Sequence, residues 1–302
     1  MRKNALLWQR ARVIKAIRDF FWERGFLEVE TPLLIPANAP EEHIDPVGVH
    51  SRYLHTSPEL CMKRLLCRGY GSIFQICHCW RDGERGGLHL PEFTMLEWYR
   101  SDCDYQQLMS DCRDLLQYLV SVCLPDSPVF RHKAYTIDPY APWVTKTVED
   151  AFRGHAHTDV WDCLEKGLYE EILTERVEPA LAGYGAPVIL RDYPEQLAAL
   201  SRTMPDNPML AERFELYLGG VELANGFSEL NDPVEQRKRF EQANFQRRAG
   251  GLSPLPLPEP FLKELADMPP ASGIALGVDR LVMLMTGSDS INDVVAFVPE
   301  EL

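Results

Sequence analysis

Apolar residues recur at helical spacing near the start of the chain, and this pattern predicts a helix over residues 5–24. Gly25 is well placed to end that helix. A strand-like segment follows at residues 26–34, where Pro32 would interrupt pairing, as is typical of an edge strand or an interface. The apolar residues that define the helix are Leu6, Leu7, Val13, Ile14, Ile17, Phe20 and Phe21.

Further strands and helices follow without the alternation of regular βαβ units. Residues 124–187 differ from the rest because they are rich in Pro, His, Asp and Glu, and they are predicted as a mainly helical insertion within a single domain of residues 1–302. The whole pattern predicts an α+β fold with a largely antiparallel sheet flanked by helices. The other predicted elements are a hairpin at 73–100, a helix at 105–123, strands at 187–194 and 213–230, and a strand followed by a helix at 272–287.

Composition and charge narrow the class of protein. The 302 residues are 45% hydrophobic and 25% charged, which is ordinary for a globular enzyme, and the net charge is -14. An acidic chain repels phosphate backbones, which disfavours a nucleic-acid partner. The basic stretch at residues 236–248 is interpreted as the solvated face of an amphipathic helix. No signal peptide or apolar run of membrane-spanning length is present, so we expect a cytoplasmic protein without membrane contact.

The chain contains eight cysteines, too few to indicate a disulfide framework at this length. Cys77 and Cys79 form a C-x-C sequence on a predicted strand, so their thiols point the same way. No second cysteine pair or His-x-His lies at zinc-finger spacing. This favours buried free thiols over a metal site.

Residues 272–287 contain a strand, a glycine and a helix whose first turn carries Arg280. A helix N-terminus offers free N–H groups, and the arginine could bind a phosphate in a bidentate manner. Gly277 would let the backbone approach a ligand closely. Ordinary packing with a surface arginine is the competing interpretation of this segment.

Three glutamates spaced by seven residues, Glu215, Glu222 and Glu229, lie on the predicted strands at 213–230. Carboxylates in an apolar setting are costly unless a cation holds them, and Mg²⁺ bridging phosphates is one such cation. Solvated surface glutamates are the alternative. The apolar residues between them favour a partly buried segment.

The hairpin has a glycine-rich tip between two charged strands. Arg81 could bind a phosphate at its base, Phe93 could stack on a nucleotide base, and the tip could close over the phosphates. A plain core position is the competing interpretation of Phe93. Together the three segments favour a site for a nucleotide.

These segments resemble a known family. ERGFLEVETPLL, FQICHCWRDGERGGLHLPEFTMLEWY and GIALGVDRLVML are similar to motifs 1, 2 and 3 of class II aminoacyl-tRNA synthetases, and HTSPELCMKRLL and ELANGFSELND are similar to the lysyl branch. Motif 1 begins almost at residue 10, so we expect no N-terminal anticodon-binding barrel and no tRNA partner. A short, acidic, lysyl-type core of this kind resembles the elongation factor P–(R)-β-lysine ligases.

The resemblance implies an ATP-dependent ligase that activates β-lysine and transfers it to a lysine side chain of elongation factor P, releasing pyrophosphate and AMP. It also implies a homodimer formed through motif 1, at about residues 5–34, and the use of ATP with Mg²⁺. The preference between α-lysine and β-lysine, and the true acceptor, stay open at this point.

The resemblance further assigns a role to individual residues. Arg81 and Arg280 would be catalytic, holding the α-phosphate and the γ-phosphate. The implied ATP-binding residues are Arg81, Asp82, Gly83, Glu84, Phe93, Glu222, Leu223, Gly277 and Arg280. The implied magnesium ligands are Glu215 and Glu222. The implied amino-acid site comprises Ser57, Pro58, Glu59, Tyr99, Glu229 and Ala275, with Glu229 receiving the ε-ammonium group of the substrate.

Motif 2 departs from the family pattern at several positions, and its loop arginine is displaced to Arg85, with Gly87 at the expected place. Gly83 replaces a nucleotide-contacting glutamate, for which Glu84 could substitute, and Leu90 replaces an asparagine that contacts ATP. Ala275 stands where lysyl-tRNA synthetases usually have glycine, and its methyl group could favour β-lysine. The alternatives are a small-molecule ligase of the asparagine synthetase A type, for which Glu229 has the wrong charge, and a non-catalytic binding protein.

Overall fold

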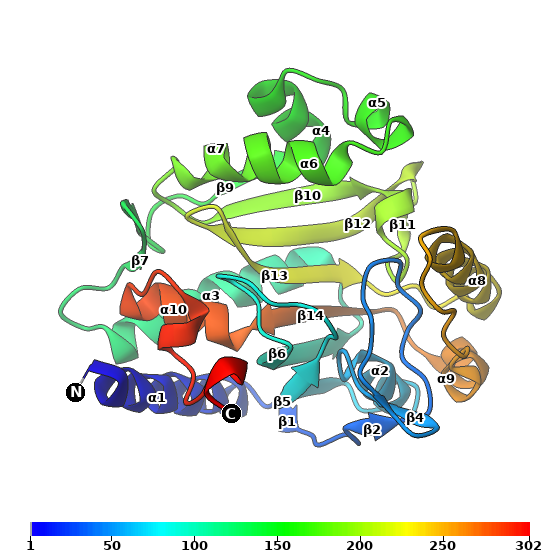
Figure 1. Ribbon diagram of the computed structural model, residues 1–302, viewed down its shortest axis with the longest axis horizontal. Helices are drawn as coiled ribbons and strands as arrows, with labels where there is room; N and C mark the ends of the chain where they lie inside the picture. Colours follow the sequence, from blue (N-terminus) through cyan, green and yellow to red (C-terminus); the bar gives the residue numbers. More distant parts are fainter. Residues whose placement is uncertain (1) are drawn as a thin grey trace.

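A nine-stranded sheet forms the centre of the molecule in the computed structural model, which describes residues 2–302 (Figure 1). Neighbouring strands are antiparallel except for the two edge pairs, β1–β5 and β9–β10, which are parallel. The predicted α+β fold with a largely antiparallel sheet is therefore confirmed. In order across the sheet the strands are β1 (Leu27–Glu28), β5 (Ser72–Trp80), β6 (Glu92–Ser101), β14 (Ala271–Gly277), β13 (Val221–Ser228), β12 (Asn207–Leu218), β10 (Val188–Pro194) and β9 (Val144–Thr147), with β11 (Thr203–Met204) beside β12.

The predicted strand at residues 26–34 is two short strands on either side of Pro32. β1 pairs with the large sheet, whereas β2 (Leu34–Ile35) belongs to a small sheet with β4 (Arg52–Leu54) and β3 (Gly48–Val49). Proline has no N–H to donate to a ladder, which explains the break.

Three helices cover one face of the sheet and enclose the main hydrophobic core (Figure 1). They are α1 (Arg2–Glu23), α3 (Tyr105–Cys123) and α10 (Val278–Thr286). The helix predicted at 5–24 thus begins three residues earlier, and Gly25 follows it with a φ of 76°. The helix predicted at 105–123 has those bounds, and the Asp104 side chain caps it by accepting the Gln106 N–H at 2.9 Å.

A second group of helices packs beside the hairpin and forms a smaller core. Its members are α2 (Glu59–Leu66), α8 (Pro233–Ala249) and α9 (Glu259–Glu264). Short 3₁₀ turns at Glu195–Leu197, Leu265–Asp267, Ile291–Asp293 and Pro299–Glu301 connect or end the elements. No helix within residues 2–302 has the length and apolar character needed to cross a lipid bilayer.

Residues 124–187 begin with strands and continue with short helices. The hairpin β7 (Phe130–His132)–β8 (Tyr135–Ile137) comes first, and β9 then joins the edge of the large sheet. The helices lie above β10 and β12 in Figure 1 and have a core of their own. They are α4 (Val148–Ala151), α5 (Val160–Glu165), α6 (Tyr169–Ile172) and α7 (Glu178–Ala182), with π-helical turns at Phe152–Ala156 and Leu173–Val177.

A buried carboxylate fixes α10 against its neighbours. Asp279 forms an ion pair with Arg10 of α1 and accepts the backbone N–H of Thr94, on β6, at 2.8 Å. Arg10 also donates to the Thr94 hydroxyl at 2.8 Å. Because Arg280 is the next residue, these contacts set where its side chain emerges.

The interpretation of residues 236–248 as a solvated face is wrong for Arg247. Its guanidinium is fully buried, donates to the backbone oxygens of Glu41, Ile44 and Ser253 at 2.8–2.9 Å, and forms an ion pair with Asp45. The arginine therefore anchors a loop, residues 41–45, against α8.

Candidate active site

One face of the sheet carries most of the candidate residues. Side chains alternate along a strand, so residues paired across strands share a face. Glu97 of β6 pairs with Ala275 of β14, which pairs with Asn225 of β13, which pairs with Glu215 of β12. This row crosses four strands and joins a nucleotide half to an amino-acid half of the site.

The nucleotide half is a cavity of about 350 Å³ at the end of β14. The Arg81 guanidinium lies over the ring of Phe93, 5.2 Å from its centroid. Thus the two hairpin residues predicted to bind a nucleotide are neighbours in space. The predicted residues that line this cavity are Arg81, Glu84, Phe93, Glu215, Glu222, Leu223, Ala275, Gly277 and Arg280.

Contacts with the hairpin tip and with β13 hold Arg280. Its guanidinium donates to the backbone oxygens of Glu222 at 2.7 Å and Leu88 at 3.2 Å, and it contacts His89 Nε2 at 2.6 Å. Burial, together with the charge of Arg280, lowers the pKa of His89. The neutral imidazole can therefore accept a hydrogen bond from the guanidinium. These contacts link the hairpin tip to the first turn of α10.

The positions at which motif 2 departs from the family pattern lie in the loop between β5 and β6, at the edge of the nucleotide cavity. Gly83 adopts a φ of 74°, a region that favours glycine. Neither Asp82 nor Gly83 lines the cavity, and the Asp82 N–H instead donates to Asp45 O at 2.8 Å. The turn brings the Glu84 carboxylate within 3.7 Å of Arg81. Leu90 is buried and lines the cavity.

Carboxylates gather where β12 and β13 meet α7. Glu215 is buried, forms an ion pair with Arg213, and accepts the Tyr217 hydroxyl at 2.6 Å. Burial raises the pKa of Glu215 and outweighs Arg213, and the charge of Glu222 acts in the same direction as burial. Burial also raises the pKa of Glu178 to about 7, with Glu222 and Glu215 contributing.

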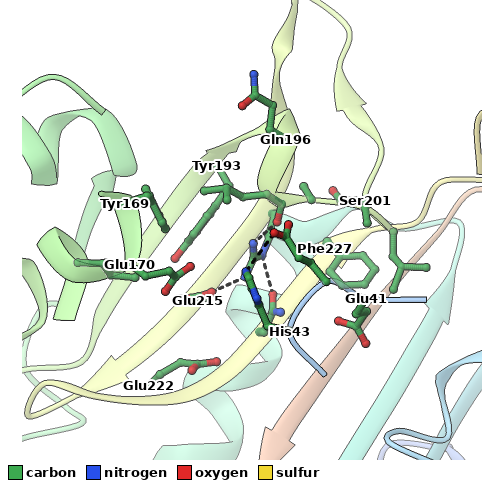
Figure 2. A pocket seen from close by; sticks show the side chains of 18 of the residues that line it. Glu41, His43, Tyr169, Glu170, Tyr193, Gln196, Ser201, Glu215, Glu222 and Phe227 are labelled. Atoms are coloured by element: carbon green, nitrogen blue, oxygen red, sulfur yellow. Dashed lines mark hydrogen bonds and ion pairs between the residues drawn. The ribbon is translucent and has the colours of Figure 1, made fainter. Parts of the chain in front are cut away.

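A second cavity of about 930 Å³ shares this acidic wall with the first (Figure 2). Figure 2 shows Glu215 and Glu222 on neighbouring strands, and Glu170 approaching from α6 of the inserted segment. Glu41 and His43 reach the cavity from the loop that Arg247 anchors. Sequence reasoning missed the contribution of the insertion, because no local pattern links residues so distant along the chain.

The amino-acid half is a buried cluster of three carboxylates and one lysine. Lys63 Nζ lies 2.5 Å from a Glu229 oxygen and 2.5 Å from a Glu59 oxygen. Glu97 accepts the Ser57 hydroxyl at 2.6 Å and the Tyr99 hydroxyl at 2.9 Å. Of the predicted substrate residues, Ser57, Glu59, Tyr99 and Glu229 are thus in one cluster, and sequence reasoning missed Lys63 and Glu97.

The turn before α2 positions Ser57. The helix begins at Glu59, and Pro58 precedes it. The Ser57 hydroxyl accepts the Glu59 N–H at 3.0 Å. Pro58 is buried, and the turn directs Ser57 toward the carboxylate cluster.

Burial dominates the electrostatics of this cluster. It raises the pKa of Glu97 to about 8, with the charge of Glu59 adding to the effect. It raises the pKa of Glu229 to about 8 although Lys63 opposes the shift. The other oxygen of Glu229, Oε1, is buried without a hydrogen-bond partner. A buried acceptor without a hydrogen-bond donor is energetically costly, so a donor that reaches it would be stabilising.

Gly273 makes room beside this oxygen. A Cβ atom at this position would lie 2.2 Å from the Tyr99 ring and 2.5 Å from Glu229 Oε1. Only glycine fits where the strand passes between these two side chains. Sequence reasoning missed Gly273, although it lies beside Ala275 in the strand already singled out.

The family comparison identifies the class of this fold and site. A model of class II tRNA synthetases (D, K and N) matches residues 1–301, and the chain belongs to this class. Curated relatives include the "Elongation factor P--(R)-beta-lysine ligase" of Salmonella gallinarum, of Salmonella paratyphi B and of Salmonella heidelberg. Each is 42% identical over 308 residues, which cover 96% of this chain and 94% of the relative. The family resemblance inferred from the motifs is confirmed.

Proposed function

We propose that the protein is an ATP-dependent ligase that activates (R)-β-lysine as an aminoacyl-adenylate and transfers it to a lysine side chain of elongation factor P. The name shared by relatives 42% identical over 96% of the chain supports this activity. We further infer that the enzyme acts in the cytoplasm.

The observation that carries the proposal is the charge of the amino-acid half. The carboxylates of Glu59 and Glu229 pair with one ammonium group, of Lys63, and burial together with the charge of Glu59 raises the pKa of Glu97 to about 8. Burial keeps Glu97 and Glu229 protonated in the free enzyme below about pH 8, and positive charge that enters the cluster would favour their ionised forms. β-Lysine supplies two ammonium groups, whereas aspartate would add negative charge. The cluster therefore favours a diamino acid.

The donor set of the nucleotide half fits ATP with Mg²⁺, as expected for class II synthetases. Arg81 and Arg280 offer guanidinium groups to phosphates, and Phe93 offers an aromatic face to adenine. Glu215 and Glu222 offer the carboxylate oxygens that Mg²⁺ prefers, and Glu178 stands close enough to raise the negative potential. A magnesium ion held there would neutralise phosphate charge.

The side chains of the site would orient the substrates and stabilise charge, and none of them would act as the nucleophile. Arg81 lines the nucleotide cavity, where it could orient the substrate carboxylate against the α-phosphorus. One carboxylate oxygen forms the new P–O bond as the bond to pyrophosphate breaks, with the two arginines stabilising the phosphate charge. The neutral acceptor amine then attacks the mixed anhydride, an amide bond forms, and AMP leaves with the proton released to solvent.

The experiment that tests the proposal combines purified protein, ATP, Mg²⁺ and unmodified elongation factor P with either (R)-β-lysine or α-lysine. Intact-mass spectrometry of elongation factor P should show one added β-lysyl residue, and more of it than of the α-lysyl product. A version of elongation factor P in which its acceptor lysine is replaced by arginine is the control. Adenylate formation without any transfer would contradict elongation factor P as the acceptor, but it would support the proposed activation of the amino acid.

We also infer a homodimer formed through motif 1. Trp8 and Trp22 of α1 have 71% and 57% of their surfaces exposed, and Leu27, Leu33 and Leu34 are also exposed. Large apolar side chains on one segment are typical of an interface. Analytical ultracentrifugation should give a dimer at micromolar concentration, and Trp22→Glu should shift it toward monomer, whereas a wild-type monomer would contradict the inference.

A further inference from the structure

Two thiols and an imidazole meet beside the active-site hairpin. Cys77 and Cys79 lie on β5, and their sulfurs are 4.0 Å apart, which confirms that they point the same way. His55, at the end of β4, places Nε2 3.8 Å from the Cys79 sulfur. The three potential ligand atoms all lie within 4.8 Å of one another. The sequence favoured free thiols because it contains no second pair at zinc spacing, but the third ligand comes from a separate strand.

Two of the three distances are close to those that a tetrahedral zinc ion would impose, and the third is within 4.8 Å. Zinc–sulfur bonds of about 2.3 Å place two sulfurs about 3.8 Å apart, and a zinc–nitrogen bond of about 2.0 Å places nitrogen about 3.5 Å from sulfur. The observed separations of 4.0 Å and 3.8 Å exceed these values by about 0.2 Å and about 0.3 Å. Small side-chain rotations would close the site.

The backbone fixes the three residues before any metal binds. The His55 N–H donates to Leu33 O at 2.9 Å, and His55 O accepts the Trp80 N–H at 3.1 Å. His55 and Cys79 are fully buried. Two thiolates would balance the charge of a divalent ion at this buried position.

We propose that His55, Cys77 and Cys79 bind one Zn²⁺ ion, with a fourth position open to water or another donor. The His55 Nε2 atom now contacts the His78 carbonyl at 2.7 Å, and binding replaces the proton of that hydrogen bond with the metal. Ser57, which donates to Glu97, lies two residues after His55. The bound ion therefore ties the turn at Ser57 to β5 and steadies the amino-acid half of the site.

The test uses the full chain after treatment with a chelator and a reductant, with Co²⁺ as the spectroscopic probe. Titration should reach one ion per chain with a thiolate-to-cobalt charge-transfer band in the near ultraviolet, and Zn²⁺ should abolish the band. Cys77→Ser and Cys79→Ser should each remove roughly half of its intensity at saturation, because each removes one of two sulfur ligands. Cys67→Ser, at a half-buried thiol on another element, is the matched control and should retain the band.

His55→Gln provides a second measurement, since it removes the nitrogen ligand and keeps both thiols. It should weaken Co²⁺ binding at least tenfold and cancel the rise in melting temperature that Zn²⁺ gives the parent. The proposal is overturned by the absence of a charge-transfer band in folded protein. It is also overturned by a band of full intensity in both serine variants. Neither result depends on the proposed ligase activity.

Discussion

The two halves of the site differ in the charged groups that they present and in their access to solvent. The nucleotide half presents Arg81 and Arg280 around an open cavity, and the Glu222 side chain there is 38% exposed. The amino-acid half buries Glu97, Glu229 and Lys63 almost completely. Under the proposed function, the open half would bind a large anion that must enter and leave, whereas the closed half would recognise a small cation by desolvated charge. Selectivity is therefore expected to depend mainly on the closed half.

The largest loss of activity is expected from a substitution in the closed half. Glu229→Gln keeps the shape but removes the carboxylate for the substrate ammonium. Losing one member of a buried charge pair costs about 3–5 kcal/mol, so kcat/KM for (R)-β-lysine should fall on the order of a thousandfold in pyrophosphate exchange. Glu259→Gln, at a surface ion pair with Arg237, is the matched control. An unchanged kcat/KM in Glu229→Gln would remove the carboxylate from its assigned role.

A smaller effect is expected at the open half. Arg280→Ala removes a charged donor to phosphate, and hydrogen bonds to charged groups contribute about 1.5–3 kcal/mol. The KM for ATP should rise on the order of a hundredfold, with the equilibrium affinity for (R)-β-lysine unchanged in calorimetry. Arg85→Ala removes an arginine of the hairpin tip that pairs with Glu300 instead, and it should behave as the parent. Equal damage by both variants would refute the assignment of Arg280.

The pH dependence distinguishes the halves without mutation. The pKa values of Glu97 and Glu229 are raised to about 8, so both carboxyls hold protons in the free enzyme below that pH. The substrate ammonium groups require the ionised form, and KM for (R)-β-lysine should therefore fall as pH rises toward 8, by about tenfold per pH unit for each carboxyl that must ionise. Steady-state kinetics between about pH 6 and pH 8 would test this. A KM that stays flat or rises would contradict the raised pKa values.

The smallest effect concerns the wall between the halves. Ala275 pairs with both Glu97 and Asn225 and lines the nucleotide cavity, so we expect its methyl group to contact the substrate backbone. Ala275→Gly should reduce the preference for (R)-β-lysine over α-lysine by about fourfold, the worth of one buried methyl group. Competition assays with both amino acids measure the ratio. Ala211→Gly, at a buried alanine of β12 away from this wall, is the control, and an equal change there would show that the effect is not local.

The fold was largely predictable because local patterns dictate it. Apolar spacing defined α1 and α3, and strand alternation defined β5 and β6. The nucleotide half was also predictable, since Arg81, Phe93 and Arg280 lie in segments with distinctive local sequences, and the structure brings them to one cavity.

The amino-acid half was only partly predictable, because its energetics depend on partners from distant segments. Lys63 resembles any helical lysine until the fold places it between Glu59 and Glu229. Glu97 looks like an outward-facing strand residue until the sheet buries it. Arg247 belongs to a basic stretch that reads as solvent-exposed, yet the loop at 41–45 covers it. Burial and pairing over long sequence separations leave no periodic signal.

The most direct test of the account is pyrophosphate exchange into ATP by the wild-type protein, with (R)-β-lysine, α-lysine and aspartate offered separately. The account predicts the fastest exchange with (R)-β-lysine, slower exchange with α-lysine, and none with aspartate. Exchange driven best by aspartate would contradict a cation-selective amino-acid half. No exchange with any of the three would show that the altered hairpin, with Gly83 and Leu90, does not support activation.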